Sequence, residues 1–91
     1  GLQHYQDPFK GITEMARVIR PGSTIHILDE ISGAMHTLQR LPAHRQYSPN
    51  PSSAIQAIQR LVPKSMVDIQ SVSLPGTNYY VLTFTKPGPA S

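Results

Sequence analysis

One feature constrains this chain most: a helical pattern that passes through one tight turn straight into a short apolar strand. Apolar residues recur at helical spacing over residues 8–20, and Pro8 fits the first position of that helix, where its missing amide costs nothing. A Pro-Gly pair at 21–22 ends the helix. Residues 24–28 are short, apolar and rich in β-branched types, which predicts a buried strand. A helix followed at once by such a strand is half of an α/β unit.

The second half of the chain predicts another helix and a closing hairpin. Asn50 can cap a helix whose first position is Pro51 and which Pro63 stops. Residues 66–74 and 79–85 have strand character, and a Pro-Gly turn signal lies between them. We therefore expect these two strands to form an antiparallel hairpin.

The segment between the two halves is less regular. Ser32 and Gly33 are expected to turn the chain, residues 34–41 allow a short helix, and residues 43–49 resemble an irregular loop. The predicted fold class is α/β. We expect three mixed strands, two of which make the C-terminal antiparallel hairpin, to form a partial sheet. Two to three helices are expected to accompany it. We expect residues 1–91 to be a single domain or a fragment of one, with a frayed tail over residues 86–91.

The strand at 24–28 raises a problem of exposed edges. It is nearly all apolar, a composition typical of a sheet interior covered on both faces. In a chain of 91 residues, this strand would be left with one unpaired side. Because an exposed apolar strand edge recruits other strands, we expect a partner to cover it, with a homodimer as one possible arrangement.

Charge and composition exclude several classes of protein. The net charge is +3, but the eight basic residues are dispersed rather than gathered on one element, so a nucleic-acid partner is not expected. There is no cysteine, which excludes disulfides and thiolate metal sites, and the histidine spacing predicts no metal site. No apolar run reaches the roughly 20 residues that span a bilayer, and no signal-peptide pattern is present. The expected location is cytoplasmic, with no membrane contact.

The first 33 residues carry a more specific pattern. A polar stretch, Gln-His-Tyr-Gln, precedes the helix, which ends in Glu-Met-Ala-Arg-Val-Ile-Arg-Pro-Gly, and the apolar strand then ends in acids. This sequence resembles the later part of a class I S-adenosylmethionine-dependent methyltransferase, in particular the ubiquinone and menaquinone C-methyltransferases. Glu14, Arg17, Val18, Pro21 and Gly22 occupy the matching positions. The closing hairpin is similar to the final antiparallel strands of that fold, so the resemblance implies a partial Rossmann-like methyltransferase sheet.

The resemblance also indicates what this chain does not carry. The family binds its methyl donor at a glycine-rich turn after the first strand, and none of the six glycines here has the G-x-G spacing. Ser23 also replaces the usual second glycine after the helix. The resemblance implies that this chain is a C-terminal part that lacks the cofactor-binding half. The intact parent would use S-adenosylmethionine to methylate a small-molecule acceptor.

Candidate site residues follow from the same resemblance. The stretch with Gln3, His4 and Tyr5 corresponds to the ligand-facing end of a family strand. Gln3 and His4 would contact the cofactor, and His4 could act as a base. Asp29 and Glu30 end the central strand and would face the same crevice, with Asp29 as a candidate acid or base. The remaining substrate-binding candidates, in addition to Tyr5 and Glu30, are Arg45 and Tyr47.

Two other functions stay open. The chain could be a non-catalytic folding or assembly module that dimerises through its exposed strand edges. It could also be a basic nucleic-acid-binding α/β domain, for which the high pI and a mixed sheet are the only support. Acids that follow a strand are also often solvated or cap the next turn, so Asp29 and Glu30 have a purely structural interpretation as well.

Overall fold

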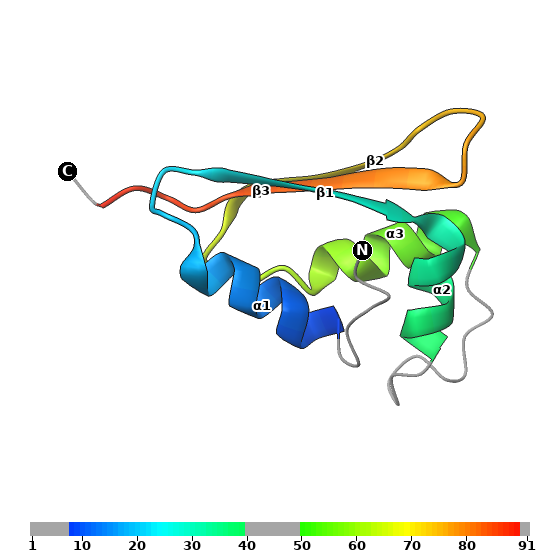
Figure 1. Cartoon of the computed structure of the whole chain (residues 1–91), viewed down its shortest axis with the longest axis horizontal. Helices are drawn as coiled ribbons and strands as arrows, with labels where there is room; N and C mark the ends of the chain where they lie inside the picture. The colour runs from blue at the N-terminus through cyan, green and yellow to red at the C-terminus, as the bar shows by residue number, and fades with distance from the viewer. Residues whose placement is uncertain (1–7, 40–49, 90–91) are drawn as a thin grey trace.

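A computed structural model describes residues 8–39 and 50–89, which form a two-layer α/β domain (Figure 1). A three-stranded sheet makes one layer, and three helices cover one face of it (Figure 1). The elements in chain order are α1 (Pro8–Val18), β1 (Thr24–Glu30), α2 (Ile31–Gln39), α3 (Pro51–Arg60), β2 (Val67–Ser73) and β3 (Tyr79–Thr85). In the part of the chain that is described, no helix has both the length and the apolar character needed to cross a membrane.

The sheet is antiparallel throughout, with the order β1-β3-β2. The hairpin of β2 and β3 is confirmed, but the expected mixed sheet is wrong. The last strand, β3, lies between the other two and runs antiparallel to both, with Leu82 paired to Ile27 on one side and to Ser71 on the other. The strands β1 and β2 do run in the same direction, but they never touch as neighbours because β3 separates them.

The core lies between the helix layer and one face of the sheet. From β3, the side chains of Tyr80, Leu82 and Phe84 are fully buried, and Ile12 of α1 and Ile58 of α3 are buried in the same cluster. Burial of this apolar surface is the main favourable term in folding. The three β3 residues alternate with less buried ones, as a strand with one covered face requires.

Within residues 8–39 and 50–89, no helix covers the opposite face of the sheet (Figure 1). Leu28 of β1 is 59% exposed and Val72 of β2 is 55% exposed on this face. The expectation that the first strand is covered on both faces is therefore not met in this chain, since its residues alternate between covered and open positions. We call this surface the bare face; its central row consists of Leu28, Val81 and Val72, which are paired across the sheet.

Local sequence signals explain where α3 begins and where α1 ends. Asn50 accepts a hydrogen bond from the Ser53 amide at 2.8 Å, and Ser53 Oγ accepts one from the Asn50 amide, so the predicted cap is a reciprocal capping box. After α1, Gly22 has φ +88°, a conformation that favours glycine. The turn expected at Ser32 and Gly33 is instead the first turn of α2.

The central position of β3 predicts which apolar substitutions matter for stability. Leu82→Ala should lower the free energy of unfolding by about 2–5 kcal/mol, because it leaves a cavity in a fully buried site paired on both sides. Chemical denaturation followed by circular dichroism measures this value. The matched control is Val72→Ala on the bare face, for which a change within about 0.5 kcal/mol is expected. Equal losses for the two variants would contradict this account of the core.

Candidate functional site

Of the residues predicted for a site, two lie in the described part of the chain. Asp29 and Glu30 end β1 and directly precede α2. The other candidates, Gln3, His4, Tyr5, Arg45 and Tyr47, lie outside the described residues. The structure therefore describes the environment of the acid pair only.

The two acids face opposite sides of the sheet. Asp29 is buried, with 4% of its surface exposed, and it pairs with Tyr80 on the side that carries the helices. Its Oδ1 accepts a hydrogen bond from the Glu30 amide at 2.9 Å. Glu30 pairs with Tyr79 and is half-buried on the opposite side. A buried carboxylate is unusual unless hydrogen bonds or a function retain it, so Asp29 is the stronger candidate of the two.

Tyr80 is the partner of Asp29 that sequence reasoning missed. Burial, and then the negative charge of Asp29, raise the pKa of the Tyr80 hydroxyl well above its usual value. The Tyr80 Oη atom is buried and makes no regular hydrogen bond within the described ranges, although the Asp29 carboxylate lies close enough to affect its pKa. The sequence did contain a signal for Tyr80. Alternate residues of a strand share a face, so Tyr80 lies on the same face as Leu82 and Phe84.

Pairing across the sheet extends this pair into a polar row. Tyr80 is paired with Asp29 in β1 and with Ser73 in β2, so the three side chains lie side by side on the helix-covered face. Because β1 and β2 run in the same direction, Asp29 and Ser73 both lie near the carboxyl ends of their strands. We call Asp29, Tyr80 and Ser73 the polar row. Asp29 and Tyr80 are buried, so Ser73 is the member of the row whose hydroxyl can meet a bound molecule directly.

Asn78, in the turn between β2 and β3, holds the start of α2 in place. The Ile31 amide donates to the Asn78 carbonyl oxygen at 2.7 Å, and the Ser32 amide donates to Asn78 Oδ1 at 3.2 Å. Asn78 Nδ2 in turn donates to Ser32 Oγ at 2.7 Å. Asn78 thus satisfies two amides of the first helical turn and holds α2 next to the acid pair.

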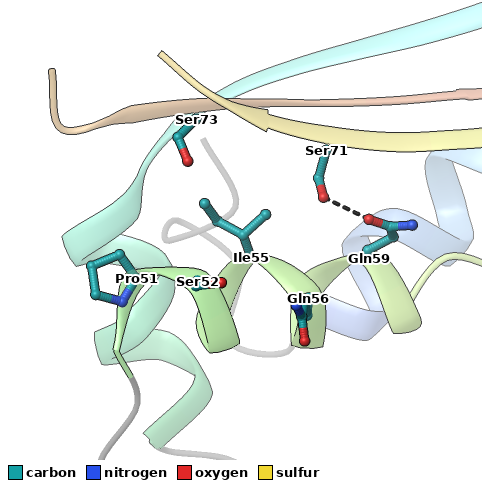
Figure 2. A pocket seen from close by; sticks show the side chains of 7 residues that line it. All are labelled: Pro51, Ser52, Ile55, Gln56, Gln59, Ser71 and Ser73. Atoms are coloured by element: carbon teal, nitrogen blue, oxygen red, sulfur yellow. Dashed lines mark hydrogen bonds between the residues drawn. The ribbon is translucent and has the colours of Figure 1, made fainter. Parts of the chain in front are cut away.

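A groove lies between α3 and β2 and includes one end of the polar row (Figure 2). Its main hollow has a volume of about 470 Å³, and an adjoining hollow of about 330 Å³ shares two of its residues, Gln56 and Gln59. We call the two together the α3/β2 groove. Its lining is mostly uncharged and polar: Ser52, Gln56 and Gln59 on α3, Ser71 and Ser73 on β2, with Ile55 among them.

The chemistry that these residues can support is limited. Among residues 8–39 and 50–89, no group of three or more histidine, cysteine or acidic side chains could hold a metal ion. His26 is exposed on the bare face, away from the polar row. The described polar side chains can therefore bind and orient a ligand, with no metal involved. No family model, curated protein or solved structure matches this chain.

The buried hydroxyl of Tyr80 generates a stability prediction. Tyr80→Phe should raise the free energy of unfolding by about 1 kcal/mol, because it removes a buried polar group that makes no regular hydrogen bond in the folded chain. Urea denaturation at pH 7 measures the difference. The matched control, Tyr79→Phe, changes an exposed hydroxyl on the other face and should have little effect. A loss of more than about 1 kcal/mol for Tyr80→Phe would instead mean that Asp29 binds this hydroxyl strongly.

The raised pKa of Tyr80 also predicts a dependence on pH. In the unfolded chain this hydroxyl loses its proton near pH 10, whereas the folded chain retains it to higher pH. Above about pH 10 the folded state therefore binds more protons, and stability falls by up to about 1.4 kcal/mol per pH unit. The Phe variant lacks this loss. The stability gap between Tyr80→Phe and the parent should therefore widen from pH 9 to pH 11, and a constant gap would contradict the assignment.

Proposed function

We propose that this chain is the C-terminal part of a class I methyltransferase domain and that it completes a sheet whose other strands hold S-adenosylmethionine. The observation that carries the proposal is the environment of β1. This strand follows α1 through the Pro21-Gly22 turn and ends in a buried Asp29, while its outer edge has no strand partner among the described residues. A further strand on that edge would bring another set of strand ends next to the acid pair.

The order of the elements supports the same proposal. The resemblance implies a helix ending in a Pro-Gly turn, an apolar strand ending in acid, and closing antiparallel strands. The observed order α1, β1 and then the β2–β3 hairpin is compatible with each of these features. The bare face, with Leu28 more than half exposed, is the surface that further helices of a larger α/β domain would cover.

The methyl donor does not fit the described residues by themselves. A nucleoside cofactor of this kind needs a cradle of backbone amides at a glycine-rich turn, and the six glycines of the chain offer no such spacing. The proposal therefore assigns the donor site to other strands, with Gln3 and His4 as the residues of this chain nearest to it. Asp29 and Glu30, together with Tyr5, Arg45 and Tyr47, are proposed to orient a small methyl acceptor.

A second candidate function is a non-catalytic assembly module. The same outer edge of β1 and the same apolar row of Leu28, Val81 and Val72 would favour pairing with a second copy of the chain. The two candidates differ in what covers the edge. The methyltransferase proposal expects a different segment that brings the donor site, whereas the assembly proposal expects an identical chain.

Titration with S-adenosylmethionine tests the proposal. The chain alone is expected to give no saturable heat in calorimetry and to scatter light as a monomer. Fusion of the cofactor-binding half of a class I methyltransferase to its N-terminus is expected to produce saturable donor binding. Tight binding by the chain alone would contradict the proposed division of the site, and a stable dimer would favour the assembly module.

Substitution of Leu28 tests whether donor binding by the fused protein depends on the bare face. Leu28→Asp should change the stability of the chain alone by less than about 0.5 kcal/mol, because Leu28 is 59% exposed there. In the fused protein, the same substitution should weaken donor binding, because it places a charge under the added helices. Equal binding by the fused protein with and without this substitution would count against the proposal.

A further inference from the structure

The outer edge of β2 carries backbone groups that β3 does not use, and it borders the α3/β2 groove. The Leu74 amide donates to the Tyr79 carbonyl oxygen at 3.0 Å, which fixes the alternation of hydrogen-bonded pairs along the hairpin. Counting back from that pair, the N–H and C=O groups of Ser71 and Ser73 point away from β3. In the described part of the chain these groups have no strand beside them, since β2 ends the sheet.

Gln59 shows how α3 already satisfies part of this edge. Its Nε2 donates to the carbonyl oxygen of Ile69 at 3.5 Å, and its Oε1 accepts from Ser71 Oγ at 2.6 Å (Figure 2). Ile69 is two residues before Ser71, so the Gln59 contact fits the same alternation. Gln59 therefore closes the beginning of the edge, and the part beyond it, towards Ser73, opens onto the main hollow of the groove.

The opposite wall of the groove carries polar side chains from α3. Ser52 and Gln56 line it from α3, and both types of side chain can donate and accept hydrogen bonds. Arg60 lines the adjoining hollow and makes no ion pair with any described residue. A peptide strand beside β2 would pair its backbone with β2 along one edge, and its side chains on the helix-covered face would meet Ser52 and Gln56 of α3.

We propose that the α3/β2 groove binds an extended peptide as a fourth strand, antiparallel to β2, with an acidic group at the Arg60 end. The length of α3, ten residues or about 15 Å, accommodates four to five extended residues. Peptide side chains beside Ser71 and Ser73 share the helix-covered face and must be small. Those beside Val72 continue the bare face and can be β-branched. This inference concerns the β2 edge rather than the β1 edge and does not depend on the methyltransferase proposal.

The probe that this pattern specifies is acetyl-Ser-Val-Ser-Val-Asp. Titrated into the ¹⁵N-labelled chain, it should give saturable amide shifts at Ser71, Ser73, Ser52 and Gln56, with slower hydrogen exchange at Ser71 and Ser73. Two control peptides separate the contribution of the backbone hydrogen bonds from that of the acidic charge. Replacing the central Ser with Pro should abolish binding, and replacing Asp with Asn should weaken it several-fold. Arg60→Gln should remove the difference between the Asp and Asn peptides.

A pair of variants on β2 isolates the backbone contribution. Ser73→Pro removes an outward N–H that the sheet does not use, a change that edge strands tolerate, and it should weaken peptide binding about tenfold or more. Ser73→Ala removes the same hydroxyl but keeps this N–H, so it should bind the peptide more tightly than Ser73→Pro does. If the proline variant fails to fold, the peptide with the central Pro tests the same hydrogen bonds in the parent chain.

Three outcomes would overturn the proposal. The first is binding that is unchanged by both prolines, and the second is an absence of saturable shifts at millimolar peptide. The third is a dimer seen by light scattering that Ser73→Pro dissociates, because a second copy of the chain would then occupy the edge. Amide shifts confined to β1 would also overturn the proposal, because the peptide would then lie on the other edge of the sheet.

Discussion

The pairing of β3 on both sides is the constraint on which the rest of the structure depends. Its seven residues supply hydrogen-bond partners to β1 and to β2, and neither of those strands contacts the other. Its buried side chains, Tyr80, Leu82 and Phe84, also form the floor on which the helices pack. Since the last regular element of the chain organises the first strand, the fold depends on contacts between residues about 55 positions apart, such as Ile27 and Leu82.

Local signals in the sequence were sufficient for most of the elements. The capping residue and proline at Asn50 and Pro51, the Pro-Gly stop after α1 and the β-branched run of β1 each act within a few residues of where they appear. For this reason the helices and the hairpin were predicted close to their observed bounds. The start of α2 was not, because its first amides are bound by Asn78, which lies 46 residues away.

The site was harder to predict than the elements for the same reason. Asp29 was identified from its place at the end of a strand, but its burial is a property of the layer that covers it. Tyr80 and Ser73 join it only through the register of two pairings. The expected mixed sheet was wrong because strand direction and order depend on which strands meet, and a sequence pattern does not specify this. The candidates at Gln3, His4, Tyr5, Arg45 and Tyr47 stay predictions.

The two edges of the sheet have different chemistry, and this difference separates the two proposals. The β1 edge continues an apolar strand that pairs regularly with β3 over all seven residues, so a long further strand could extend it. The β2 edge is irregular at its beginning, where the register shifts between Val67 and Gln70 and Asp68 has φ 53°. Such a bulge prevents long strand pairing. With Gln59 beside it, only the short stretch towards Ser73 stays open, which suits a short peptide rather than the rest of a domain.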